Sequence, residues 1–304
     1  MIETGSASGR EASATAPSGV PTRTRHQASW TARRVLGVSL TYLALCAFSA
    51  LAVFPLLWIL SASLQSAGGA TLGIQLPIPP DLSSYADAMV RLPLLTFLRN
   101  STFITVTATV GAILSTSLVG FSLARLRWPM RDAVFAQVIA TMMMPGVVTL
   151  VPTFIMFKYL GWLDTFLPLI VPQWTGGAFF IFLMRQFMRG LPPEMDEAAR
   201  VDGASSLAVY WYIIMPLCGP VLAAICIFSF LNSWNDFLAP SIYLSSINNY
   251  TLALGVYMYQ GRFGNHWNLV MAASMFIVIP VLIVFLVAQR YFIRGIQLTG
   301  LAGR

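Results

Sequence analysis

Long stretches without a single charged residue recur along this chain of 304 residues, and they limit what the chain can fold into. In lipid, a backbone has to satisfy its hydrogen bonds internally, and a helix of about 20 apolar residues crosses a hydrocarbon layer of about 30 Å. The sequence therefore predicts an all-α membrane protein that crosses the bilayer six times. The uncharged windows assigned to these crossings are 35–60, 100–124, 133–157, 165–184, 203–235 and 267–289.

Composition supports a membrane protein and argues against other classes. Of all residues, 57% are hydrophobic and 10% are charged, whereas soluble domains contain about 25% charged residues. The net charge of +7 does not indicate nucleic-acid binding, because the basic residues lie at the ends of uncharged runs and do not gather with aromatic residues. Cys46, Cys218 and Cys226 lie in apolar runs without metal-ligand spacing, so we expect buried single thiols and no metal site.

The first 34 residues differ from the rest. Residues 1–34 are rich in Ser, Ala, Thr, Gly and Pro and carry five arginines, which is typical of a disordered basic tail. The window 35–60 that follows is too long, and too far from the N-terminus, for a cleaved signal peptide. We therefore expect an uncleaved first span and a membrane domain over residues 35–304.

The distribution of Lys and Arg predicts the orientation. With six crossings and a cytoplasmic N-terminus, 14 of the 18 basic residues fall on the cytoplasmic side. Membrane proteins carry an excess of Lys and Arg in their cytoplasmic segments, so this distribution favours a cytoplasmic N-terminus. Both termini and the charged segment near residue 200 are therefore expected in the cytoplasm.

That charged segment, 194–216, has the sequence EMDEAARVDGASSLAVYWYIIMP. Five charges within nine residues, good helix formers and two preceding prolines predict a short amphipathic helix over about 194–206. Gly203 comes directly after the charges. It has two interpretations: the end of the helix, or a place where another backbone or a partner approaches closely.

The spacing of this segment resembles a known family. Glu197-Ala198-Ala199, three residues, Gly203, nine residues, Ile213, one residue and Met215-Pro216 resemble the EAA loop of binding-protein-dependent ABC importer permeases, where Leu is usual in place of Met215. In that family the loop is the cytoplasmic coupling helix, which docks into a cleft of the ATPase. The resemblance implies that the ATPase-coupling residues are Glu197, Ala198, Ala199, Asp202, Gly203 and Pro216.

Other motifs resemble the carbohydrate branch of this family, and in particular its shorter, maltose-type permease with six spans. They are Asn100-Ser101, Ala124-Arg125, Met144-Pro145, Ser233-Trp234-Asn235-Asp236-Phe237 and the C-terminal GIQLTGLAGR. The resemblance implies the type I importer permease fold, a bacterial inner or plasma membrane location, and a heterodimer with a second permease. It also implies two ATPase subunits, which bind ATP-Mg, and an extracytoplasmic solute-binding protein.

No catalytic or cofactor-binding motif is present. Lys158, the only lysine, precedes Tyr159, so the chain has no GxxxxGK[ST] phosphate loop and cannot itself be the ATPase. Neither His26 nor His266 has a Cys or carboxylate at a catalytic spacing, and we expect no enzymatic activity. Two alternatives to an importer permease remain: an ion-coupled secondary carrier, which normally needs ionisable residues within its spans, and a membrane scaffold or assembly factor.

Neutral polar and aromatic residues in the spans suggest a path for a carbohydrate. The candidates are Gln173, Trp174, Asn232, Trp234 and Asn235. Aromatic rings stack on the C–H faces of a sugar, and amides bind its hydroxyl groups. The alternatives are an interfacial position for Trp234 and a hydrogen bond between helices for Asn232.

Overall fold

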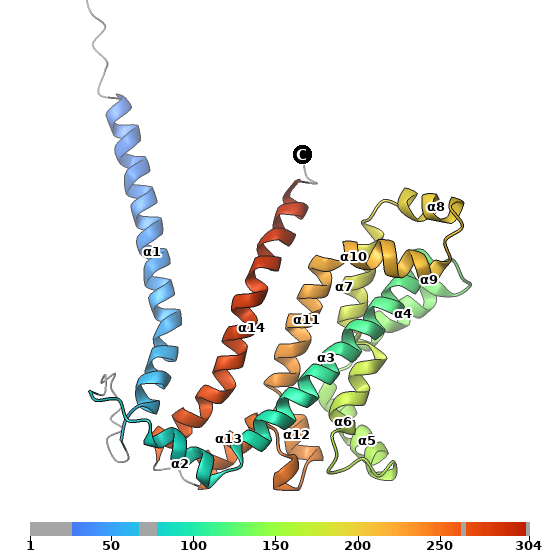
Figure 1. The fold of residues 1–304 in the computed structure, drawn as a ribbon. Coiled ribbons are helices and arrows are strands. Elements are labelled where there is room, and N and C mark those ends of the chain that lie inside the picture. Colours follow the sequence, from blue (N-terminus) through green and yellow to red (C-terminus); the bar gives the residue numbers. More distant parts are fainter. Residues whose placement is uncertain (1–25, 67–77, 263–265, 302–304) are drawn as a thin grey trace, which may run out of the picture. The chain divides into compact units, whose positions relative to one another are not determined.

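The computed structural model of the chain describes residues 26–66, 78–262 and 266–301, and all regular structure in these ranges is helical (Figure 1). The chain forms two compact units, residues 1–55 and residues 56–304. The first unit contains most of α1, which runs from His26 to Ser63 and continues into the second unit. The all-α architecture agrees with the expectation from the uncharged windows.

Helix α1 begins earlier than the hydrophobic window that predicted it. Residues 26–34 belong to α1, although the sequence analysis assigns them to the tail, and residues 1–25 lie outside the described ranges. The difference has a physical reason: hydropathy marks the stretch that fits in lipid, whereas a helix extends into water wherever its residues favour it. The part that qualifies as a span is Arg34–Ser63.

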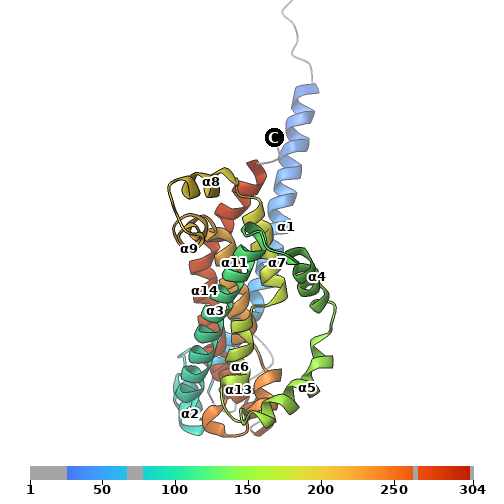
Figure 2. The ribbon, with the colours of Figure 1, turned by 90° about the vertical axis from the view of Figure 1, so that its right-hand side faces the viewer.

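In the second unit, α3 is the central helix. It runs from Leu94 to Arg125 and packs against α7 (Ala178–Arg189) and α11 (Gly219–Trp234), as Figures 1 and 2 show. Helix α14 (Trp267–Leu301) packs against α11 and against α2 (Ser83–Arg91). Because α3 has buried residues along its whole length, it connects the two ends of this unit.

Two of the expected crossings are bent pairs of helices. Helices α4 (Arg131–Thr141) and α5 (Gly146–Tyr159) meet at 99°, and the segment Ser206–Leu217 meets α11 at 79°. Pro145 and Pro220 lie at these two bends, where each removes a backbone donor. The described residues contain four helices long enough to span a membrane, or up to six spans if each bent pair counts as one.

The helices α4 and α5 pack less than the others. Helix α4 buries no residue and α5 buries only Phe157, and Figure 2 shows the two helices leaving the bundle of α3, α7 and α11. Many of their exposed side chains are apolar, among them Val134 in α4 and Val147 and Val151 in α5. This surface suits lipid or another apolar partner.

The remaining helices lie at the ends of the bundle. Figure 1 shows α8 (Glu194–Val201) at one end, and α2, α12 (Leu238–Tyr243) and α13 (Leu252–Arg262) at the other. A short helix α6 (Leu167–Ile170) and a 3-10 turn η1 (Val171–Thr175) lead into α7. The expectation of buried thiols holds for Cys218 but is wrong for Cys46 and Cys226, which are free and exposed. An apolar run in a membrane protein does not by itself place a side chain in the packed interior, because lipid-facing positions are apolar too.

Candidate functional site

Helix α8 ends at Val201, shorter than the expected 194–206, because Gly203 adopts the left-handed conformation with φ of +82°. The N–H of Ala204 donates to the carbonyl of Ala199 at 2.9 Å, and the N–H of Gly203 donates to the carbonyl of Arg200 at 3.1 Å. This pair of bonds is the Schellman pattern that closes a helix. A side chain at Gly203 would meet no atom of this chain within 4 Å, so within the chain the glycine is a helix end.

The chain becomes helical again immediately after this turn. The Ser205 side chain accepts a hydrogen bond from the N–H of Ala208 at 3.2 Å and so begins α9 (Ser206–Ala208). A π-helical turn η2 (Val209–Ile214) and α10 (Met215–Leu217), which contains the exposed Pro216, follow. The Tyr210 hydroxyl in η2 hydrogen-bonds Ser117 of α3 at 2.7 Å, in the buried interior.

A buried ion pair fixes α8 to the end of α3. Arg125 Nη1 lies 3.5 Å from Asp196 Oδ2, and the two side chains are 7% and 10% exposed. Arg125 Nη2 also donates to the carbonyl of Leu191 at 2.9 Å, and Ala199 packs into the same core as Met188 and Tyr210. Neither Asp196 nor its pairing with Arg125 was predicted from the sequence, because no local pattern links two residues 71 positions apart.

The other side of α8 faces outward. Glu197, Ala198, Asp202 and Gly203 are exposed, whereas Ala199 is buried. Next to Glu197 lies a broad depression of about 790 Å³. It is lined in part by Arg127, Arg189 and Arg200. One side of this segment therefore attaches to the bundle, and the other exposes charged groups.

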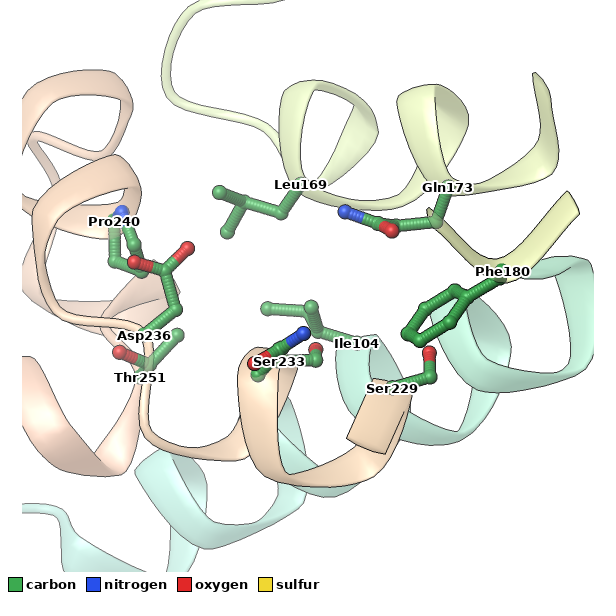
Figure 3. A pocket seen from close by; sticks show the side chains of 10 residues that line it. Ile104, Leu169, Gln173, Phe180, Ser229, Ser233, Asp236, Pro240 and Thr251 are labelled. Atoms are coloured by element: carbon green, nitrogen blue, oxygen red, sulfur yellow. The ribbon is translucent and has the colours of Figure 1, made fainter. Parts of the chain in front are cut away.

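A second site lies near the opposite end, where α6, η1, α11 and α12 meet α3. Its cavity of about 180 Å³ is shown in Figure 3. The polar lining consists of Gln173, Ser229, Asn232, Ser233, Asp236 and Thr251, and the apolar lining of Ile104, Leu169, Phe180 and Pro240. Ser233 also donates to the Thr105 hydroxyl at 3.3 Å, which ties α11 to α3 beside the cavity.

Two of the five residues that the sequence suggested for a carbohydrate path line this cavity. They are Gln173 and Asn232. Trp174, Trp234 and Asn235 are not among the lining residues. The cavity therefore unites only part of the proposed set and adds hydroxyl groups from outside that set, such as those of Ser229 and Ser233.

The side chains outside the cavity have other contacts. The Trp174 ring fills the space beside Gly111, and its Nε1 donates to the carbonyl of Thr107 at 3.1 Å. Trp234 is 4% exposed, and its Nε1 donates to the backbone carbonyl of Ile277 in α14 at 3.1 Å. Trp234 is therefore a core residue and not an interfacial one. The Asn235 amide donates to the Leu231 carbonyl of its own helix at 3.0 Å.

Asp236 is the one ionisable residue in the lining of this cavity. Its Oδ1 accepts the N–H of Ala239 at 3.2 Å, near the start of α12, and its side chain is half-buried. Burial raises the pKa of Asp236, while hydrogen bonds from the backbone of Ala239 and Leu238 act in the opposite direction. Asp236 was not among the residues predicted for the site, although a lone carboxylate directly after a polar run was a usable signal.

Within the described ranges, no group of three or more His, Cys, Asp or Glu side chains is placed to hold a metal ion.

Comparison with known proteins gives a consistent result. Residues 116–298 match the family described as "Binding-protein-dependent transport system inner membrane component". The chain is 33% identical, over 83% of its length and 92% of the relative's, to an arabinooligosaccharides transport system permease protein of Halalkalibacterium halodurans. It is 34% identical, over 66% of its length and 71% of the relative's, to an sn-glycerol-3-phosphate transport system permease protein of Pectobacterium atrosepticum.

A solved structure shows the same fold. The crystal structure of a bacterial ABC transporter involved in import of the acidic polysaccharide alginate contains a chain that is 25% identical to this one. The match has a TM-score of 0.75 and covers 90% of this chain and 100% of that one. These similarities confirm the expected permease fold and identify transport components, not enzymes.

Proposed function

The chain belongs to the family of binding-protein-dependent transport system inner membrane components, and from this premise we propose that it forms half of the translocation pathway of an ATP-driven carbohydrate importer. The finer parts of the proposal concern how it couples to the ATPase, which substrate it passes and which subunits surround it. The observation that carries the proposal is α8, whose one side is fixed in the bundle and whose other side is exposed.

Coupling requires a rigid link between the docking surface and the spans. Asp196, Ala199 and the Schellman turn fix α8, and the Arg125 ion pair joins it to the end of α3. A force on the exposed Glu197 therefore reaches α3 with little local deformation. We assign the docking surface to Glu197, Ala198, Asp202 and Gly203, with Glu197 paired to a basic group of the ATPase. Ala199 attaches this surface to the bundle, and we assign the exposed Pro216 of α10 to the same coupling set.

The cavity near the other end of the bundle supports a carbohydrate substrate. Amide and hydroxyl groups of Gln173, Asn232 and Ser229 suit sugar hydroxyls, and the ring of Phe180 suits the C–H face of a sugar. Its volume of about 180 Å³ is below the roughly 300–1,000 Å³ of most ligand sites. We therefore assign the rest of the path to a second, non-identical permease, which the exposed apolar side chains of α4 and α5 suit as a contact surface.

The surrounding assembly consists of two ATPase subunits, which bind ATP-Mg, and an extracytoplasmic solute-binding protein that delivers the substrate. Fourteen of the 18 basic residues favour a cytoplasmic location for both termini and α8. Cysteines at the exposed Asn248 and Val201 check this orientation: an impermeant thiol reagent outside intact cells should label the first and not the second.

Reconstitution tests the function as a whole. The complex in proteoliposomes should take up one member of a panel of radiolabelled sugars. Uptake should require ATP on the side of the ATPase subunits and the binding protein on the opposite side. Uptake that persists without ATP would identify a secondary carrier. Assembly with the ATPase but no uptake of any sugar in the panel would leave a scaffold as the better account.

A further inference from the structure

We propose that Asp236 is a specificity-determining residue, whose carboxylate gives the cavity beside α11 a negative potential that excludes anionic carbohydrates and admits uncharged ones. The inference rests on the proposed function and deepens it, because it names the charge class of the substrate. Figure 3 shows the Asp236 carboxylate pointing into the space bounded by Leu169 and Gln173.

The charge in this cavity is not balanced by the lining. The other nine lining residues are neutral, and none of the three salt bridges within the described ranges includes Asp236. The neutral groups present both donors and acceptors, which hydroxyl-rich molecules match. The one charged group presents only acceptor oxygens when it is ionised.

Two other aspartates show what a structural role looks like in this protein. Asp196 is paired with Arg125. Asp164, in the loop after α5, accepts backbone N–H bonds from Ser245 at 2.9 Å and Ser246 at 2.8 Å, and these bonds, led by the Ser246 side chain, hold its pKa well below its usual range. Asp236 has neither a cationic partner nor a side-chain donor within the described ranges: its carboxylate is bonded by backbone N–H groups of its own turn, that of Ala239 at 3.2 Å and that of Leu238.

A phosphate, sulfonate or uronate brought into this space would therefore meet a like charge in a partly desolvated site, where repulsion is stronger than in water. An uncharged sugar meets no such barrier. On this proposal, the substrate of the present chain differs in charge from the anionic molecules named for two relatives, sn-glycerol-3-phosphate and the acidic polysaccharide alginate.

Charged thiol reagents measure the potential in the cavity without knowledge of the substrate. The assembled complex, with Cys46, Cys218 and Cys226 replaced by alanine, carries Asn232→Cys as a reporter, because Asn232 is exposed and lines the cavity. In detergent, it is treated with methanethiosulfonates bearing an ethylammonium group, an ethylsulfonate group or a neutral methyl group. The measured quantity is the ratio of the cationic to the anionic reaction rate, in which the thiolate fraction cancels.

Removing the carboxylate should lower this ratio roughly tenfold, because each reagent carries a unit charge a few ångströms from Asp236. Asp236→Asn tests this, and Asp236→Ser removes the same charge while keeping an oxygen for the Ala239 N–H. Asp236→Glu should preserve the ratio. The matched control is Asp87→Asn, which removes one charge from an exposed position on α2 outside the cavity and should leave the ratio unchanged.

Three results would overturn the inference: a ratio that neither neutral variant lowers, an equal fall in the Asp87 control, or a reporter cysteine that does not react with the neutral reagent. An anionic sugar as the transported member of the panel would also overturn it. Uptake of a neutral sugar with an unchanged ratio defeats only this inference, whereas a lowered ratio without any uptake defeats the proposed function and leaves the potential of the cavity established.

Discussion

Asp196 and Asp236 are carboxylates removed from bulk water near opposite ends of the same bundle, and the protein treats them differently. Asp196 lies 3.5 Å from Arg125, within the contact that fixes α8 to α3. Asp236 has no cationic partner within the described ranges and lines a cavity. Both residues follow or precede apolar segments by only a few positions, so sequence context alone does not separate them.

The difference shows what a partner does to a buried charge. A carboxylate that is paired with arginine inside the fold is neutralised, and its removal disturbs structure more than chemistry. A carboxylate that is partly desolvated without a cation lowers the stability of the fold when it is ionised. Such carboxylates occur mainly at functional sites, where the charge acts on a ligand. By this criterion the Asp196 carboxylate holds α8 against α3, whereas the Asp236 carboxylate is available to interact with a molecule that enters the cavity.

The largest effect is expected from breaking the ion pair. Arg125→Ala leaves the Asp196 carboxylate buried without a partner, and the loss of one partner of a buried pair typically destabilises by about 3–5 kcal/mol. Thermal unfolding of the solubilised complex should show a clear fall in the midpoint. The double variant Arg125→Leu with Asp196→Leu should recover much of this loss, because it removes both charges together.

The comparison supplies the control for this experiment. Asp236→Asn should leave the midpoint unchanged or raise it at neutral pH, since the raised pKa of Asp236 means that its ionised form opposes folding. This opposition is absent below the ordinary aspartate pKa and is fully present once the pH has risen above the raised value. A fall in the midpoint as large as that of Arg125→Ala would show that the two carboxylates are not different in kind.

A smaller but more specific effect is expected at the left-handed glycines. Gly203→Val places a β-branched residue at φ of +82°, which strains the turn after α8 by about 1–3 kcal/mol, although its side chain meets open space. We expect uptake to fall about tenfold or more, with membrane insertion intact. Binding-protein-stimulated ATP hydrolysis and retention of the ATPase during purification are the measurements.

Gly161→Val is the matched control for Gly203→Val. Gly161 has φ of +69° and equally open surroundings, but it lies in the loop between α5 and α6. It should strain the backbone to a similar degree and leave the stimulation of ATP hydrolysis near that of the unmodified complex. Equal loss of stimulation in both variants would trace the effect to general instability and not to α8.

The smallest effect is expected from Glu197→Ala. Glu197 is exposed on α8 and has no salt bridge within the described ranges, and a surface ion pair with a partner contributes about 0–1 kcal/mol unless docking desolvates it. Stimulated ATP hydrolysis should therefore fall less than about fivefold. A loss greater than that of Gly203→Val would show that the charge, and not the shape of the turn, governs docking.

Sequence by itself determined the class of fold and the position of the charged α8 segment, to which we assign the coupling role. Uncharged windows mark spans because every residue in lipid contributes to the same transfer free energy, so a local sum is sufficient. The spacing from Glu197 to Pro216 is likewise local, and it identified the α8 segment and left two interpretations for Gly203. Its end at Val201 depended on one backbone dihedral that the sequence leaves open.

Only the tertiary structure decided which polar side chains share a site. Asn232 and Trp234 are two residues apart on α11, yet one lines the cavity and the other packs against α14, because residues two apart on a helix point in different directions. Asp196 and Arg125 are 71 positions apart, and Asp236 shares its cavity with Gln173 from another helical segment. Such contacts depend on how helices pack, and each window of sequence is compatible with many packings.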